Sequence, residues 1–132
     1  MLLRPSSLVM AAGLAVAAGC GGGMASSSNP GPQVTIRDFT FTPSTLMVKA
    51  GSVVTWTNMG PAVHTVTSDT MVFESMNLGA PVGGDPYGGG GMAAGTFQFT
   101  FNTPGTYAYH CSLHPPSIPA YSGFTGTIVV TQ

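Results

Sequence analysis

The side chains best suited to chemistry in this sequence are one cysteine and two histidines. The string Cys111-Ser112-Leu113-His114 places a thiol and an imidazole across a short turn at the end of an expected strand, and His64 lies far upstream, near the start of another. One thiolate with two imidazoles is the ligand set of trigonal copper sites, because thiolate stabilises Cu(I) and imidazole suits both oxidation states. The pattern therefore predicts a mononuclear copper site made of His64, Cys111 and His114.

Each of these residues, taken alone, also fits an ordinary structural role. A lone cysteine on an aromatic strand is usually a small buried apolar residue. His114, which precedes Pro115-Pro116, fits a loop histidine, and His64 fits a surface histidine with its hydrogen bonds satisfied. The combination of all three favours the metal site. His110 is interpreted as structural or surface-exposed, because alternation along a strand turns it away from the side occupied by Cys111.

The composition argues against several other classes of function. Three Lys+Arg and four Asp+Glu make 5% of the chain charged, whereas a typical soluble domain carries about 25%. Nucleic-acid binding needs clustered basic residues, so no nucleic-acid partner is expected. Four scattered acids leave little for carboxylate-pair catalysis or for an oxygen cage around a hard metal ion.

The first part of the chain is interpreted as a targeting region. Residues 1–19 start with a short positive region that ends at Arg4, and they contain an apolar stretch too short to span a bilayer, which is typical of a secretory signal. The string Ala17-Ala18-Gly19-Cys20 resembles a bacterial lipobox, in which the cysteine is lipidated; ordinary signal cleavage nearby is the alternative. Residues 20–32 predict a flexible Gly/Ser/Pro tether. The protein is therefore expected to be exported, periplasmic or on the cell surface, and anchored to the membrane through Cys20.

The remaining residues, 33–132, predict one all-β domain. Alternation of apolar and polar residues indicates strands near 34–37, 46–48, 54–57, 63–68, 97–101, 107–111 and 128–130, with Pro-, Gly- and Asn-rich turns between them. Short strands with frequent turns predict a two-sheet antiparallel β-sandwich. Core positions are expected for Trp56, Phe97, Phe99 and Phe101, and Asn58 is expected to close a turn.

The segment 76–95 interrupts this rhythm with a run of glycines and two prolines. Its length predicts a long irregular loop. The composition favours disorder, and a partner-docking loop is the alternative.

Three strings carry a family resemblance: Trp56-Thr57-Asn58, the stretch HTVTS beginning at His64, and the stretch PGTYAYHCSLHP that contains Cys111 and His114. On them, residues 33–132 resemble the cupredoxins, especially the small plastocyanin and amicyanin type. The resemblance implies a Greek-key antiparallel β-sandwich with one type 1 copper ion. It also implies His64, Cys111 and His114 as ligands, and outer-sphere electron transfer as the activity.

The chain departs from the family at the axial position of the copper. The family usually places a methionine a few residues after the second histidine, but none of the eight Met follows Cys111. Alignment on Gly126, which opens the last strand, puts Phe124 at the axial position. Because Phe cannot ligate, three-coordinate copper is expected. The alternative axial donors are the carbonyl of Val63, Ser117, and the thioethers of Met71, Met76 and Met92.

The resemblance implies a non-enzymatic one-electron carrier. Its partners are expected to be redox proteins, which the sequence does not name, and a monomer is expected. A copper oxidase or nitrite reductase needs a second copper centre, for which three histidines are too few. A copper chaperone, another copper-binding protein or an accessory subunit of a copper oxidase or reductase is the alternative. Chaperone and storage sites tend to use Met-rich, His-rich or paired-Cys clusters, which this sequence lacks.

Overall fold

The computed structural model describes residues 30–83 and 91–132. Cys20, most of the predicted tether and the centre of the Gly-rich loop lie outside the described residues. Among those that are described, no helix has the length and apolar character needed to cross a bilayer.

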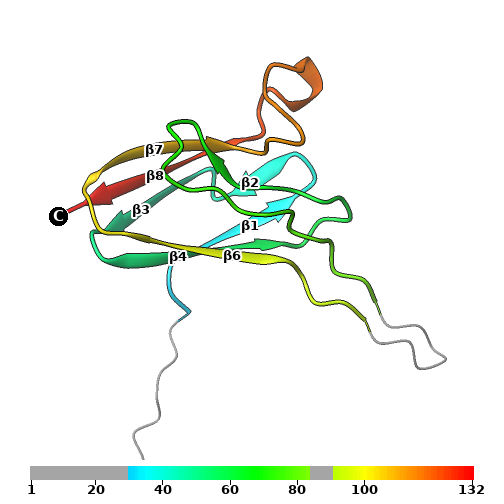
Figure 1. The fold of residues 1–132 in the computed structure, drawn as a ribbon, viewed down its shortest axis with the longest axis horizontal. Coiled ribbons are helices and arrows are strands. Elements are labelled where there is room, and N and C mark those ends of the chain that lie inside the picture. Colours follow the sequence, from blue (N-terminus) through cyan, green and yellow to red (C-terminus); the bar gives the residue numbers. More distant parts are fainter. Residues whose placement is uncertain (1–29, 84–90) are drawn as a thin grey trace, which may run out of the picture.

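Two four-stranded sheets face each other across a shared apolar core (Figure 1). The first sheet has the order β2-β1-β4-β6, formed by Thr40–Thr42, Gln33–Arg37, Ser52–Asn58 and Thr96–Phe101. The second has the order β3-β8-β7-β5, formed by Thr45–Lys49, Thr125–Thr131, Gly105–His110 and Thr67–Ser68. A short 3-10 turn, η1 (Pro119–Tyr121), lies in the loop between β7 and β8. The predicted all-β sandwich is confirmed.

Both sheets are mixed, so the prediction of purely antiparallel pairing is wrong. Strand β1 runs parallel to β4, and β3 runs parallel to β8, whereas the other pairs are antiparallel. Alternation along a strand indicates which face each residue occupies. It carries no information about the direction of the neighbouring strand, which depends on contacts distant in sequence.

The strand predicted at 63–68 is shorter than expected. It joins a ladder only at Thr67–Ser68, in β5. Upstream, His64 forms an isolated bridge with Leu78, and the Val66 N–H donates to Ser75 Oγ at 2.8 Å. The backbone around His64 therefore satisfies its hydrogen bonds with the following loop rather than with a neighbouring strand.

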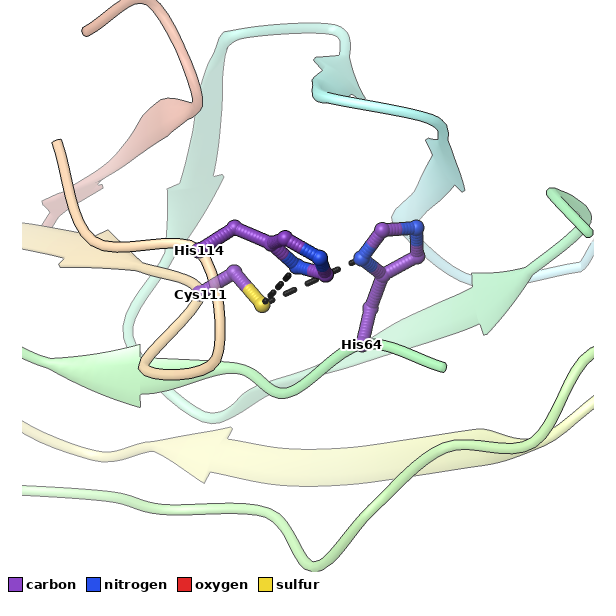
Figure 2. Close-up of side chains that lie close together, drawn as sticks. All are labelled: His64, Cys111 and His114. Carbon is purple, nitrogen blue, oxygen red and sulfur yellow. Dashed lines mark hydrogen bonds between the residues drawn. The ribbon is translucent and has the colours of Figure 1, made fainter. Parts of the chain in front are cut away.

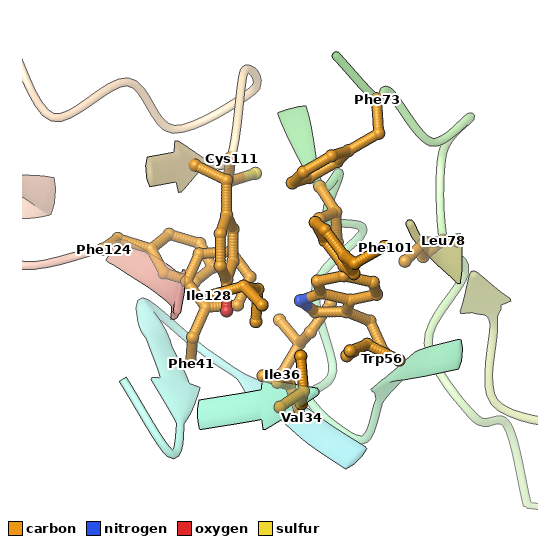
Figure 3. Packing of buried hydrophobic residues seen from close by; sticks show 14 of the residues in the cluster. Val34, Ile36, Phe41, Trp56, Phe73, Leu78, Phe101, Cys111, Phe124 and Ile128 are labelled. Atoms are coloured by element: carbon orange, nitrogen blue, oxygen red, sulfur yellow. The ribbon is translucent and has the colours of Figure 1, made fainter. Parts of the chain in front are cut away.

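The core gathers the inward-facing residues of both sheets (Figure 3). Trp56 and Phe101 are fully buried as predicted, while Phe97 and Phe99 are half-buried and pack against them. Burying one such side chain contributes about 1.5–3 kcal/mol. Cys111 and Phe124 belong to the same cluster. The predicted ligand Cys111 and the predicted axial residue Phe124 are therefore part of the core.

Tyr109 and Gly126 show how tightly β7 and β8 pack. The two residues face each other in the ladder, and a Cβ atom at position 126 would overlap the tyrosine ring. Glycine therefore allows the Tyr109 ring to lie against β8, where both the ring and its hydroxyl are buried.

Candidate metal centre

Three potential metal ligands meet at one end of the sandwich. The ligand atoms of His64, Cys111 and His114 all lie within 4.8 Å of one another, the only such cluster found in the described part of the chain. Cys111 Sγ is 3.9 Å from Nδ1 of His64 and 3.5 Å from Nδ1 of His114, and both rings turn this nitrogen toward the sulfur (Figure 2). The structure thus brings together the three residues predicted from the sequence.

Two of the three residues come from the loop between β7 and β8. Cys111 follows the last residue of β7, and the His114 N–H donates to the Cys111 carbonyl at 3.2 Å, closing a tight turn. At its base the loop is held by the ladder pair His110 and Thr125. The loop lies at the opposite end of the sandwich from the C terminus (Figure 1).

The sulfur of Cys111 is held by Thr65, which neighbours His64. The Thr65 N–H donates to Sγ at 3.3 Å, and its hydroxyl lies 3.8 Å from the same atom. The Thr65 hydroxyl also accepts the Ser112 N–H at 2.8 Å. These contacts fix the position of the Cys111 sulfur relative to the backbone of Thr65. Thr65 therefore ties the segment of His64 to that of Cys111.

His64 is fully buried, and both its backbone N–H and its carbonyl are hydrogen-bonded. Its N–H donates to the Leu78 carbonyl at 3.2 Å, and its carbonyl accepts the Leu78 N–H at 2.8 Å. Burial lowers the pKa of His64, and the nearby carboxylate of Asp38 opposes this shift. The imidazole is therefore neutral at pH 7, as a metal ligand must be.

The turn before His64 is organised by Asn58, as predicted. Its side-chain oxygen accepts the Gly60 N–H at 3.0 Å, and its amide donates to the carbonyls of Ala62 and Leu78, each at 2.8 Å. Asn58 is buried, and its side chain makes no hydrogen bond to the three ligand candidates. It sets the path of the chain that leads to His64.

Aromatic rings surround the two imidazoles. Phe124 is fully buried, with its ring centroid 5.0 Å from that of His64 and 6.2 Å from that of His114. Phe39 and Tyr121 pack against His114 at 5.3 and 5.0 Å. His114 is only half-buried. The cluster is thus shielded by apolar surface, and His114 is its member nearest to solvent.

The side chains proposed as alternative axial donors are exposed in this structure. Met71, Met76 and Met92 are 81%, 88% and 68% exposed. Ser117 is exposed as well. Phe124 is the predicted axial residue that does lie beside the histidines.

His110 lies apart from the cluster. Its Nδ1 is 2.6 Å from Asp69 Oδ1, and the pair is partly exposed. This position agrees with the interpretation of His110 as a structural or surface residue.

Sequence reasoning missed Asp38, Phe39 and Thr65. Asp38 Oδ1 lies 3.3 Å from His64 Nε2, and both Asp38 and Phe39 belong to the turn between β1 and β2. Strand β2 was not predicted, so nothing placed this turn near the histidines. The available signal for Asp38 was the scarcity of acidic residues. The chain has only four, so a specific role could have been sought for each of them.

A family comparison decides the identity of this arrangement. The model for copper-binding proteins of the plastocyanin/azurin family matches residues 32–131. The chain belongs to this family. Its cofactor is accordingly one type 1 copper ion, and the donor set of one thiolate and two imidazoles fits that metal.

Individual members of the family show the same relationship. Amicyanin-alpha of Methylorubrum extorquens is 37% identical over 83 residues, which are 63% of this chain and 63% of that protein. The match therefore spans less than two thirds of the relative. A methionine-to-leucine variant of oxidised amicyanin is 28% identical, with a TM-score of 0.54 over 81% of this chain and 88% of that one.

More distant structures share the fold of this cupredoxin. A purple cupredoxin from Nitrosopumilus maritimus has a TM-score of 0.58 at 24% identity, over 76% of this chain and 99% of that one. A copper-containing nitrite reductase from Thermus scotoductus has a TM-score of 0.55 at 20% identity, over 77% of this chain but only 22% of the enzyme. The same fold thus also occurs as one part of a larger enzyme.

Proposed function

We propose that this cupredoxin is a one-electron carrier whose copper is held by Nδ1 of His64, Sγ of Cys111 and Nδ1 of His114. The observation that carries the proposal is the convergence of these three atoms within 4.8 Å at one end of the sandwich. Copper bound there supplies a reversible change between Cu(II) and Cu(I).

The protein supplies a geometry that suits both oxidation states. His64 is fixed by its double hydrogen bond to Leu78, and Cys111 by the N–H of Thr65. Ligands that are held in place before the electron arrives need little rearrangement when the charge changes. Phe124 excludes water from one side of the cluster and offers no donor atom.

Electrons enter and leave through His114 in this proposal. It is half-buried, whereas His64 and Cys111 are fully buried, so a partner protein approaches the metal most closely over the His114 ring. The formal net charge of −1 gives little long-range steering, and recognition of the partner is therefore expected to depend on short-range contacts.

The carrier role is favoured over an enzymatic one by the distribution of histidines. The chain has three, of which two are in the cluster and the third, His110, contacts Asp69. A second copper centre would need additional imidazoles. We further propose that the carrier is exported and held at a membrane by a lipid on Cys20, as the sequence of residues 1–20 indicates.

Copper loading of the full chain and of single variants tests the proposal. The wild type is expected to bind one copper ion by native mass spectrometry and to show an intense thiolate-to-Cu(II) band that bleaches on reduction and returns on oxidation. Cys111→Ser should abolish this band, because a hydroxyl cannot replace the thiolate in the transition. His64→Ala and His114→Ala should each alter it strongly.

His110→Ala is the matched control, since it removes a histidine outside the cluster. It should retain the band of the wild type. A band that survives in Cys111→Ser, or that disappears in His110→Ala, would show that the ligand assignment is wrong. A protein that takes up only Cu(I) and stays colourless under oxidant would indicate copper storage or delivery instead.

A further inference from the structure

The turn between β1 and β2 brings an acidic side chain to the buried histidine. Arg37 and Thr40 are paired across the two strands, so Asp38 and Phe39 alone form the tip of the hairpin. Phe39 has a φ of 63°, in the left-handed region that bulky residues rarely adopt. This conformation sits directly beside Asp38, at the point where the chain reverses next to the histidine cluster.

The Asp38 carboxylate faces the outer nitrogen of His64. Oδ1 lies 3.3 Å from Nε2, whereas Nδ1 of the same ring faces Cys111 Sγ at 3.9 Å. The two nitrogens therefore have different partners. A neutral imidazole that offers its Nδ1 lone pair to a metal carries its proton on Nε2, and that N–H can donate only to an acceptor on the far side, where Asp38 lies.

The neighbouring backbone is shaped to receive this carboxylate. Asp38 Oδ1 also accepts the Ala62 N–H at 3.4 Å. A Cβ atom on Gly60 would lie 2.7 Å from the same oxygen and 3.0 Å from the Asp38 nitrogen. Glycine at this position permits the turn organised by Asn58 to pack directly on the hairpin tip, so both segments contribute to the placement of Asp38.

We propose that Asp38 is a positioning residue for the copper site, holding His64 in the tautomer that carries its proton on Nε2 and making the ring a stronger donor toward Cu(II). This rests on the proposed function of the site. A carboxylate behind a ligating histidine fixes the ring and raises its basicity. His64 is fully buried, so water is poorly placed to substitute for the carboxylate.

The tautomer can be measured without any metal. Long-range proton–nitrogen NMR spectra of the metal-free, full-length protein distinguish a proton on Nε2 from one on Nδ1. The wild type should show the Nε2–H form of His64, and Asp38→Ala should show a mixture or the other form. Asp38→Asn keeps an acceptor oxygen and should largely restore the Nε2–H form.

The second measurement is the reduction potential of the copper-loaded protein. Outer partners of metal-bound histidines typically change metal affinity by about 10- to 100-fold. A tenfold weaker preference for Cu(II) over Cu(I) in Asp38→Ala corresponds to a rise of about 59 mV in potential. Asp38→Asn should also raise the potential, because it removes the negative charge while keeping the hydrogen bond.

Asp69→Asn is the matched control, since Asp69 is, within the described part of the chain, the other carboxylate in contact with a histidine, His110, which lies outside the cluster. It removes the same charge and should leave both the His64 tautomer and the potential unchanged. An unaltered tautomer and potential in Asp38→Ala, or an equal rise in potential in Asp69→Asn, would overturn the proposal. If Asp38→Ala does not fold, Asp38→Asn decides by its potential. A wild type that lacks the copper band would instead refute the proposed function, and the metal-free NMR result would still stand for Asp38.

Discussion

The ring of Phe124 stands nearly perpendicular to the ring of His64, with an interplanar angle of 85° and centroids 5.0 Å apart. On its other side, Phe124 stacks on Phe41 at 4.6 Å. Phe124 is therefore both a core residue and a wall of the metal site. Its position explains how a chain without a methionine in this loop can still enclose the cluster.

Phe124→Met is expected to lower the reduction potential of the copper-loaded protein. A thioether that reaches the metal donates charge and favours Cu(II), whereas the wild-type ring offers apolar surface alone. The potential, measured by protein-film voltammetry, checks this together with the visible spectrum. Phe41→Met is the control, since Phe41 contacts Phe124 but makes no aromatic contact with either ligand histidine. An unchanged potential and spectrum in Phe124→Met would show that another group faces the metal.

The left-handed backbone at Phe39 predicts an unusual order of stabilities. At a φ of 63°, glycine is unstrained and alanine is not, so Phe39→Gly should be more stable than Phe39→Ala by about 1 kcal/mol. Both variants lack the ring, and the difference therefore reports the backbone alone. Denaturant unfolding of the metal-free proteins measures it. The same pair of substitutions at exposed Thr40, in β2, should give the opposite order, and a matching order at the two positions would contradict the prediction.

Tyr109 predicts a loss of stability in alkali. Burial raises its pKa to about 12 from the ordinary 10.0. Because the unfolded chain loses this proton first, the free energy of unfolding should fall as the pH rises from 10 toward 12. The expected slope approaches about 1.4 kcal/mol per pH unit from this one group.

Tyr109→Phe is the informative comparison for the alkaline effect. The buried hydroxyl of Tyr109 has no hydrogen-bond partner. The free energy of unfolding of the variant should therefore stay within about 1 kcal/mol of that of the wild type at pH 7. Between pH 10 and 12 it should lose less stability than the wild type in denaturant titrations. Equal slopes for the two proteins would refute the assignment to Tyr109.

Cys20→Ala is expected to move the protein from the membrane fraction to the soluble fraction of the exporting cell. The reason is the predicted lipid on Cys20, which supplies the membrane affinity through its acyl chains. Cell fractionation with immunoblotting measures the distribution. The copper spectrum should not change, because the predicted tether separates Cys20 from the domain. A wild type and variant with the same distribution would mean that Cys20 is not lipidated.

Two of the three ligand candidates were predictable because their signal is local. Cys111 and His114 lie in one short string, and alternation along β7 correctly put Cys111 on the buried side and His110 on the other. The outer partners were not predictable by the same means. Asp38 reaches His64 through a hairpin whose tip has neither glycine nor asparagine to mark it, and the left-handed conformation falls on Phe39 instead.

The irregular segment around His64 shows a second limit. Its alternating residues resemble a strand, yet Val66 donates to the Ser75 side chain and His64 pairs with Leu78. Those partners lie in a loop whose path depends on the side-chain hydrogen bonds of Asn58. Periodicity cannot reveal such competition for backbone hydrogen bonds, nor could it reveal that β1 and β4 run in parallel.

The loop between β7 and β8 begins and ends at a single ladder pair, His110 and Thr125. Between these two residues lie Cys111, His114 and Phe124, while His64 and Asp38 belong to other segments. Insertions, deletions or replacement of this loop can therefore vary the metal environment, while the ladder pair of His110 and Thr125 and both sheets keep their register. Such an arrangement makes the redox properties of the protein evolvable separately from its folding, since one exchangeable segment contains most of the chemistry and the rest of the chain contains most of the stability.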